Sequence, residues 1–431
     1  MSGAKLFNFV RQNASGNFKE VVPEATDSNI SDISNILFND AYQPLLNEFV
    51  TNLINRIGLT IVRNKSFDNP LAILKKGSTP LGTDIQDIYE NPADAEQYAI
   101  TNAEMAKLLT ITDPDTKVAY YRRNRKDMYT KTIAREALQG AFVSWNKFEN
   151  YIGAITQSLY SGNYIDEFEY TKGLVVGAYE NNKVIIETVS AVTSAATATA
   201  FVKKCRKLYK KMSFPSTDYN AYSKMTGDAK KVKTWTDPSR VVVLVTSDVM
   251  QETDVEVLAK AFNMNETDFL GRVIEVDKFD EDGKIQGIIC DEAFFQIYDN
   301  IFRFDEFYNA RTMSWNEYLH VWETFAICPF ANAVILATEA PDVPATAVAV
   351  DKSTVSIAEG ATATVNVTLT PLQSTATVTV ASSAEGKATA SISNGVVTIT
   401  GVDAGSATVT VTATNSDTTT KTATIAVTVT E

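Results

Sequence analysis

Residues 395–414 read GVVTITGVDAGSATVTVTAT, and apolar and polar side chains alternate along most of this stretch. A period of two is typical of β-strands with one buried face. The same alternation recurs around Val365 and Val427, and Asn394-Gly395 precedes one of the runs. Because glycine accepts a positive φ, this dipeptide predicts a two-residue hairpin turn. The sequence therefore predicts a series of short strands joined by tight turns.

The alternating pattern belongs to a region, residues 345–431, whose composition differs from that of the preceding chain. It has 87 residues, of which 23 are Thr and 14 are Val, and it contains no aromatic residue, Cys, Met, His or Arg. Short strands with turns at this spacing predict an Ig-like β-sandwich. A disordered Thr-rich tract is the alternative, but disorder does not need regularly placed Val and Ile. The stretch 395–414 resembles bacterial Ig-like domains of group 2, and Pro341 and Pro344 mark a linker at 341–344.

Residues 1–340 are rich in aromatic side chains and mix two periodicities, which predicts an α+β architecture. Apolar residues at helical spacing predict helices over 32–57, with a break at Pro44, and over 130–160. Segment 240–250 predicts a fully buried strand. Further elements are expected as a helix at 255–262 and as strands at 272–277, 285–291 and 325–337.

The bulk properties limit the class of protein. A chain of 431 residues exceeds the usual size of one hydrophobic core, so at least two domains are expected. Its formal net charge of −13 disfavours nonspecific nucleic-acid binding by the whole surface, so contact with DNA would need a local basic patch. The three cysteines, Cys205, Cys290 and Cys328, lie far apart and predict isolated buried thiols. The start lacks an apolar run of signal-peptide length, so folding in a reducing cytoplasm is expected.

Few residues are candidates for catalysis or for binding a metal or cofactor. His320 is the one histidine, and we expect it to be a packed or hydrogen-bonded side chain rather than a catalyst. No glycine-rich phosphate loop occurs, and the acidic run 277–283 lacks the ligand pattern of a calcium loop, so we expect a solvated hairpin turn there. The sequence therefore predicts no catalytic residue, no metal site and no cofactor.

Two groups of basic residues stand out against the acidic background. The first lies in and beside a polar, turn-rich stretch, 63–120, that suits an extended hairpin. Its members are candidates for contacts with another subunit, with a solvated stretch as the alternative; they are Lys75, Lys76, Arg122, Arg123 and Arg125.

The second group predicts an amphipathic helix with a positive face. Apolar positions at Val202, Cys205, Leu208 and Met212 are flanked by basic residues, which are Lys203, Lys204, Arg206, Lys207, Lys210 and Lys211. This face would contact DNA or an acidic neighbour, or it is a solvated helix face.

Four segments resemble the major capsid proteins of phi29-like short-tailed bacteriophages. They are NPLAILKKGSTPLGTDIQDIY at 69–89, AFVSWNKFEN at 141–150, DVEVLAKAFNMNETDFLG at 254–271 and WNEYLHVWETFAICPFANAV at 315–334. The resemblance covers nearly the whole chain, and it implies the Hong Kong 97 fold. The implied layout is a capsid domain at 1–340, with an N-terminal arm 1–57, an extended loop 58–128, a peripheral domain with a spine helix at 129–180 and 311–340, and an axial domain at 181–310.

The resemblance also implies a function. The chain would be a podovirus virion protein, not an enzyme, that self-assembles in the host cytoplasm into the pentamers and hexamers of an icosahedral or prolate head around double-stranded DNA. Expected partners are copies of itself, a separate scaffolding protein, a portal or connector protein and, through weak contacts, the packaged DNA. Some capsid proteins of this fold begin with a scaffolding segment. Here a helix of the mature domain is expected within the first few tens of residues, which leaves no room for such a segment, so the scaffolding protein is expected as a separate chain. The Ig-like domain would be displayed on the outer surface, with host cell-wall glycans as a candidate ligand.

Two other classes of protein are alternatives to a capsid subunit. A surface adhesin or receptor-binding protein also carries such tails, but it should have an export signal and usually an anchor. An intracellular enzyme with a binding module would need the active-site motifs that the sequence lacks.

Overall fold

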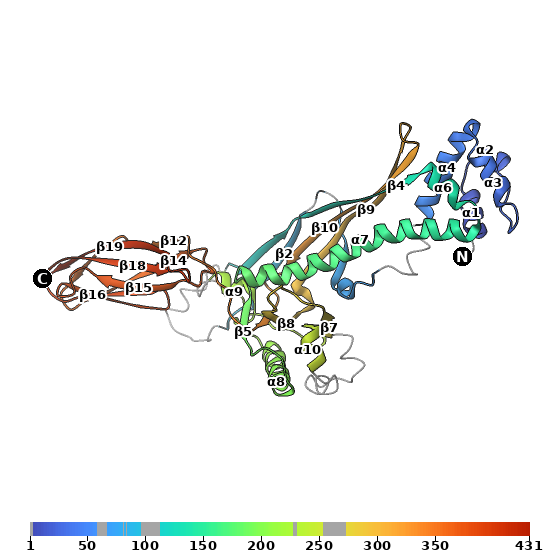
Figure 1. Ribbon diagram of the computed structural model, residues 1–431. Helices are drawn as coiled ribbons and strands as arrows, with labels where there is room; N and C mark the ends of the chain where they lie inside the picture. The colour runs from blue at the N-terminus through green and yellow to red at the C-terminus, as the bar shows by residue number, and fades with distance from the viewer. Residues whose placement is uncertain are drawn as a thin grey trace. The chain divides into compact units, whose positions relative to one another are not determined.

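The computed structural model describes residues 3–57, 67–80, 82, 84–95, 113–226, 231–252 and 273–431. The chain forms two compact units. One comprises Met1–Ile88, Val118–Lys172 and Phe295–Ile327, and the other comprises Tyr89–Lys117, Gly173–Phe294 and Cys328–Glu431. Both contain helices and strands, so the predicted α+β class is confirmed (Figure 1).

The first unit is built on a four-stranded sheet in the order β1-β9-β10-β4. Its strands are β1 Lys75–Ser78, β4 Arg125–Ala134, β9 Phe295–Asn309 and β10 Ser314–Ile327. β10 pairs antiparallel with both β9 and β4, while β1 joins β9 in parallel. Although β9 falls in the range predicted for the axial domain, this pairing makes it part of the first unit. On β10, Trp315, Leu319 and Val321 are fully buried, which defines the inner face of the sheet.

A long helix, α7, covers this inner face (Figure 1). It spans Trp145–Glu180 and follows the short α6, Arg135–Ala141. Leu159 of α7 packs on Leu319 and Val321. The single helix predicted over 130–160 is therefore wrong at both ends: residues 125–134 form β4, and the helix continues to Glu180. Thr130, Thr132 and Ile133 are β-branched and favour a strand, which the broad apolar stripe of the sequence concealed.

Four helices at the N-terminus complete the core of the first unit. They are α1 Gly3–Gln12, α2 Gly16–Val21, α3 Ile30–Leu37 and α4 Gln43–Ile57. Their aromatic side chains cluster with those of the α6–α7 region: the rings of Phe7 and Phe49 lie 5.1 Å apart, and Phe49 lies 5.8 Å from Phe142, which follows α6. The predicted break at Pro44 occurs just before it, where a turn of 3₁₀ helix, η1 (Asp40–Tyr42), separates α3 from α4. The range predicted as an N-terminal arm is thus folded into helices.

A two-stranded sheet forms without pairing to the strands of the other sheets. It pairs β2, Ile85–Glu90, with β3, Thr116–Tyr121. A single turn of 3₁₀ helix, η2 (Pro70–Leu74), precedes β1 and the segment leading to this hairpin. The strands lie in the polar, turn-rich stretch that predicted an extended hairpin.

The second unit contains a five-stranded mixed sheet in the order β5-β11-β8-β6-β7. The strands are β5 Ile185–Thr188, β6 Val241–Thr246, β7 Val273–Val276, β8 Ile285–Asp291 and β11 Ala333–Ala337. Every residue of β6 and β8 is buried. The buried strand predicted over 240–250 is therefore confirmed for 241–246, but its end is wrong, because helix α10 begins at Ser247. Helices α8 Ala195–Met212, α9 Ala221–Thr226 and α10 Ser247–Glu252 belong to the same unit. The helix predicted at 255–262 lies outside the described residues.

Two predicted elements need correction. The strand expected over 325–337 is two strands in different sheets, β10 and β11, because Pro329 lies between them and cannot donate to a sheet ladder. The turn at 277–283 is present, with Gly283 at φ 65°, but it is not a hairpin. It connects β7 to β8, and β6 lies between those two strands in the sheet.

The C-terminal region forms the predicted Ig-like sandwich. One sheet has the order β12-β14-β17-β16 and the other β13-β19-β18-β15. The strands are β12 Ala347–Val350, β13 Thr354–Ala358, β14 Thr362–Thr370, β15 Thr377–Ser382, β16 Ala388–Ser393, β17 Val396–Gly401, β18 Gly405–Thr414 and β19 Thr420–Thr430. Asn394 and Gly395 have φ values of 51° and 75° and connect β16 to β17, which confirms the hairpin turn. The core is entirely aliphatic, with Val365, Ile399 and Val409 fully buried.

The central strand β8 supplies a stability test. A Cβ added at Gly287 would lie 2.7 Å from the carbonyl oxygen of Leu244 on the neighbouring strand. We therefore expect Gly287→Ala to destabilise the fold by about 1–3 kcal/mol through overpacking. Gly177 of α7 has nothing within 4 Å of such a Cβ, so Gly177→Ala should stabilise by up to about 1 kcal/mol. Urea unfolding of both variants measures the difference, and an unchanged Gly287→Ala would contradict the close packing.

Candidate functional site

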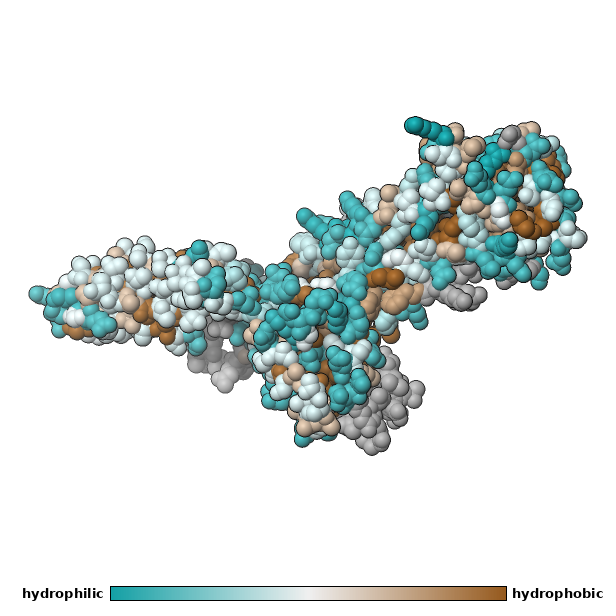
Figure 2. Space-filling model, in the orientation of Figure 1, coloured by the Kyte–Doolittle hydropathy of each residue, from teal (hydrophilic) through white to brown (hydrophobic). Residues whose placement is uncertain are grey.

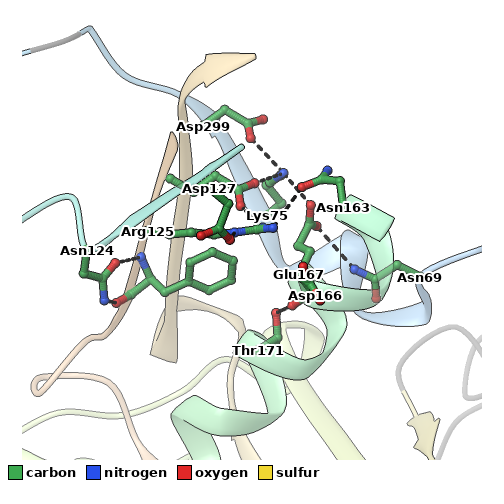
Figure 3. Close-up of polar contacts among 12 residues, drawn as sticks. Asn69, Lys75, Asn124, Arg125, Asp127, Asn163, Asp166, Glu167, Thr171 and Asp299 are labelled. Carbon is green, nitrogen blue, oxygen red and sulfur yellow. Dashed lines mark hydrogen bonds and ion pairs between the residues drawn. The ribbon is translucent and has the colours of Figure 1, made fainter. Parts of the chain in front are cut away.

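A cluster of buried charges lies at the base of the extended loop in the first unit (Figure 3). We call it the loop-root cluster and define it as Lys75, Arg125, Glu167 and Glu323, with the flanking carboxylates of Asp127 and Asp299. Both Lys75, which begins β1, and Arg125, which begins β4, fall in the range 58–128 predicted as the extended loop, and we use the term loop for the stretch 76–124 between them. Glu167 comes from α7 and Glu323 from β10. The cluster therefore joins both ends of the loop to the sheet and to the helix that covers it.

Lys75 is surrounded by three carboxylates. Its Nζ lies 2.9 Å from Oε2 of Glu167, 2.8 Å from Oδ1 of Asp299 and 2.7 Å from Oε1 of Glu323. The side chain of Glu323 is fully buried and that of Glu167 is 5% exposed. Asn69 donates to the other oxygen of Glu167 at 3.3 Å. The ammonium thus uses all of its donors on acids of three different elements.

Arg125 occupies the other side of Glu323, directly opposite it in the pairing of β4 with β10. Its guanidinium donates to Oε2 of Glu323, to Asp127 at 2.6 Å and to Asn163 at 3.0 Å. The ring of Tyr170 lies 4.9 Å from the guanidinium carbon. A buried guanidinium whose planar donors are matched in this way is held in one orientation.

Burial and pairing oppose each other in the pKa values of the cluster. Burial raises the pKa of Glu323 to about 7, against the lowering effect of Lys75 and Arg125. Burial would lower the pKa of Lys75, but the carboxylates of Glu323 and Glu167 outweigh it and the pKa rises above its ordinary value. Both oxygens of Glu323 accept from cations, so the geometry favours the ionised pair.

The other basic residues predicted near the loop lie outside this cluster. Arg122 is 78% exposed and pairs with Asp84 at 2.8 Å. The guanidinium of Arg123 lies over the ring of Trp322, with its carbon 4.6 Å from the ring centroid. Lys76 is exposed. The structure therefore pairs the half-buried Lys75 and the buried Arg125 with carboxylates of the same chain, and it leaves Arg122 and Lys76 on the surface.

The second predicted group lies on α8, which is amphipathic as expected. Val202, Cys205, Leu208 and Met212 are buried, together with Phe201. Lys204 pairs with Glu187. The remaining basic residues are exposed, and none has an ion-pair partner among the residues that the structure describes; they are Lys203, Arg206, Lys207, Lys210 and Lys211.

Part of the hairpin contacts its own chain within the second unit. The hydroxyl of Tyr89 donates to the carbonyl of Lys233 at 2.6 Å, and Asn91 exchanges bonds with Lys231 and Lys233 at 3.0 Å and 2.9 Å. The ring of Tyr89 also stacks on Phe330, with centroids 5.6 Å apart. Tyr89 and Asn91 therefore hold this segment by hydrogen bonds of their own, in addition to the loop-root cluster at the two ends of the loop.

Sequence reasoning missed a second buried acidic site, the pair Glu306 and Glu317. They lie directly opposite each other on β9 and β10. Glu317 is fully buried, and neither of its carboxyl oxygens has a hydrogen-bond partner in the described structure. Thr51 donates to one oxygen of Glu306, and the other has none there. The signal was available: Glu317 alternates in phase with Trp315 and Leu319, which are core positions.

The residues considered for chemistry lie in ordinary surroundings. The three cysteines are buried and form no disulfide, as predicted. His320 is half-exposed on β10, with Nε2 3.7 Å from a carboxylate oxygen of Asp305, rather than packed in a core. Within the described ranges, no group of three or more His, Cys, Asp or Glu side chains is placed to hold a metal ion. No helix in those ranges is long and apolar enough to cross a membrane.

Comparison with known proteins gives two matches to family models. The model of phi29-like phage major capsid proteins matches residues 7–337, and that of bacterial Ig-like domains of group 2 matches residues 344–423. The major capsid protein of Bacillus phage PZA is 36% identical over 360 residues, covering 82% of this chain and 77% of the relative. That of Streptococcus phage Cp-1 is 27% identical over 356 residues, covering 77% and 93%. Among solved structures, the capsid of Staphylococcus phage Andhra matches with a TM-score of 0.53 at 16% identity, covering 65% of this chain and 87% of that one; this likeness concerns the fold alone.

The loop-root cluster predicts a large cost for losing one buried partner. Arg125→Ala would leave Oε2 of the buried Glu323 without its donor, and Lys75 as the one cation among the four carboxylates of the cluster. We therefore expect a loss of about 3–5 kcal/mol in the free energy of unfolding. Arg122→Ala removes an exposed ion pair three residues away and should cost less than about 1 kcal/mol. Urea unfolding measures both, and equal effects would mean that the buried cluster does not hold the loop ends.

The Glu306–Glu317 pair predicts a stability that falls with rising pH. Burial, followed by repulsion from Glu306, raises the pKa of Glu317 from 4.5 to about 8. A group whose pKa is higher in the folded state contributes stability below its unfolded pKa, and that contribution is lost as the pH rises through the folded pKa. Wild-type stability should therefore fall between pH 5 and 8 with a slope of up to about 1.4 kcal/mol per pH unit.

Glu317→Gln removes the titrating group and should flatten this slope, as urea unfolding at several pH values would measure. The control is Glu136→Gln, which neutralises an exposed carboxylate of α6 and should leave the slope as in wild type. An identical pH profile for wild type and Glu317→Gln would show that Glu317 does not titrate in this range.

Proposed function

The chain belongs to the phi29-like phage major capsid protein family, and on this premise we propose that it tiles a phage head as pentamers and hexamers around double-stranded DNA. It is a structural virion protein of a family that is not an enzyme family. It assembles with copies of itself into a capsid. We propose an icosahedral or prolate head that forms in the host cytoplasm on a separate scaffolding protein and incorporates a portal protein.

The observation that carries the proposal is the loop-root cluster. A segment that reaches a neighbouring subunit is useful only if its direction is fixed, because each disordered residue costs conformational entropy on binding. Lys75 and Arg125 hold the two ends of the loop on one carboxylate, that of Glu323. The loop therefore leaves the sheet from a rigid base.

The hairpin of the loop carries an apolar face. Gln86 donates to the hydroxyl of Tyr120 at 3.5 Å, so these residues lie on one side of the β2-β3 sheet. Alternation along the strands places Ile88 and Val118 on the same side. Ile88 is 58%, Val118 41% and Tyr120 61% exposed. Three exposed apolar side chains on one small face suit burial against a partner.

The outer face of the β9-β10-β4 sheet is a complementary surface. Met128 and Phe307 are exposed on it, and Trp322 lies beneath the cations of Arg123 and Lys126. The hairpin is acidic: residues 84–95 and 113–121 contain six carboxylates and one lysine. We propose that the hairpin of one subunit docks on this face of the next, a head-to-tail contact that closes into rings.

The Ig-like domain is proposed to be displayed on the outside of the head. Its surface is dominated by pale, weakly polar side chains in Figure 2, consistent with its Thr-rich sequence. The linker is bonded to the domain it precedes: the N–H of Thr375 donates to the carbonyl of Val343, and the N–H of Val343 donates to Oγ1 of Thr375. The N–H of Ala345 also donates to Oδ1 of Asn415. Such a neutral surface suits weak contacts with neighbouring subunits or with host cell-wall glycans.

Charge on the hairpin face tests the proposal. The double variant Ile88→Asp and Val118→Asp should prevent shell formation when the chain is co-expressed with the scaffolding protein of its phage, because two carboxylates would be buried in the contact. Negative-stain microscopy and sedimentation would show subunits or small oligomers in place of shells.

Val402→Asp is the control, since Val402 is 43% exposed but lies in the Ig-like domain; shells should form as in wild type. A thermal melt of each variant checks that the subunit is folded. Normal shells from a folded double variant would refute the proposed contact.

A further inference from the structure

Helix α8 carries a row of positive charge that the chain itself does not neutralise. Lys203, Lys207 and Lys210 follow one another at spacings of four and three residues, so they form one stripe, and Arg206 and Lys211 flank it. All five side chains are exposed, and none has an ion-pair partner among the described residues. Only Lys204, at the margin of the stripe, is paired, with Glu187.

The direction of this stripe is fixed by the opposite face of the helix. Phe201, Cys205 and Leu208 are at most 2% exposed and belong to one core with strands β6, β8 and β11. Ser194 caps the N-terminus with a reciprocal capping box, which fixes where the helix begins. The charged face therefore cannot turn inward without opening the core.

A solvated helix face does not account for the pattern. α8 contains no Asp or Glu, so its cations repel one another at spacings of three and four residues, which destabilises a helix. Lys210 and Lys211 near the C-terminus are favoured by the helix dipole, but Lys203, Arg206 and Lys207 lie too far from that end. The charges in the middle of the helix are therefore explained best by an external anion.

We propose that α8 binds the phosphate backbone of double-stranded DNA without reading its sequence. The stripe from Lys203 to Lys211 is about 12 Å long, and duplex DNA presents a phosphate charge about every 1.7 Å along its axis. Any position along the duplex thus offers phosphates to the whole stripe. The exposed residues of the helix are otherwise Ala and Thr, so it lacks the large apolar anchors on which protein interfaces depend.

One neighbouring feature would serve a different ligand. Phe214, just after the helix, is 69% exposed, and Trp235 is 47% exposed. Thr234 and Ser216 form a β-bridge that connects their two segments. These rings could anchor an acidic protein segment, or stack on the bases of a single strand. Backbone binding by α8 does not need them, which makes Phe214→Ala a discriminating variant.

The test measures binding of the unassembled full-length chain to a fluorescently labelled 30-base-pair duplex by anisotropy, at several salt concentrations. Five phosphate contacts predict a slope of log K against log salt near about −4.5. The variant Lys203→Gln/Lys207→Gln/Lys210→Gln should reduce this slope to about −1.8 and weaken binding at low salt by more than about tenfold.

A charge-matched control separates the stripe from net charge. Lys19→Gln/Lys147→Gln/Lys421→Gln removes the same charge from exposed positions elsewhere and should bind as wild type, as should Phe214→Ala. The proposal is overturned if the two triple variants lose binding equally, if the chain does not bind the duplex at low salt, or if Phe214→Ala abolishes binding. It is also overturned if polyglutamate or single-stranded DNA binds more tightly than the duplex.

The inference rests on the proposed function only for the choice of DNA as the anion. The assay uses subunits that have not assembled, so its result is independent of whether the hairpin variants form shells. A chain that forms shells but does not bind DNA refutes the role of α8 and leaves the proposed capsid function intact.

Discussion

The structure of the first unit depends on the burial of Glu323 between two cations. An ionised carboxylate in a protein interior is tolerated only if it is paired and its oxygens are satisfied. Lys75 and Arg125 supply both conditions, each on a different oxygen. Because removing either cation leaves one buried oxygen of Glu323 without a donor, the positions of β1, β4 and β10 depend on one another.

The Ig-like sandwich is stabilised by an aliphatic core rather than by a buried cluster of charges. Its core contains Val, Ile and Ala and no aromatic side chain, so each residue buries little apolar area. Close approach compensates in part: a Cβ at Gly401 would lie 2.7 Å from the carbonyl oxygen of Ala358 in the facing sheet. The first unit instead concentrates Phe and Trp in one cluster. This contrast in composition is the reason that the sequence predicts a boundary at Pro341 and Pro344.

Local patterns in the sequence were sufficient where a single periodicity governs the fold. The strands of the sandwich, the turn at Asn394-Gly395 and the amphipathic α8 could all be predicted, because each depends on neighbours within a few residues. The helix over 130–160 was misplaced because apolar spacing does not distinguish the buried face of β4 from that of α7. The loop-root cluster could not be predicted, since Lys75 and Glu323 are 248 residues apart and only the pairing of the strands brings them together.

Two positions on β10 show how the type of cation on the neighbouring strand affects the ionisation of a buried glutamate. Glu323 lies opposite Arg125 on β4, and six residues earlier Glu317 lies opposite Lys131 on the same strand. Arg125 is buried and bonded to its glutamate, whereas Lys131 is exposed and Glu317 has no hydrogen-bond partner in the described structure. The delocalised guanidinium is more weakly hydrated than an ammonium and offers donors in several directions, so it enters the interior at lower cost. The same register therefore gives a charged, rigid anchor at one position and, at the other, a carboxyl group whose raised pKa keeps it protonated.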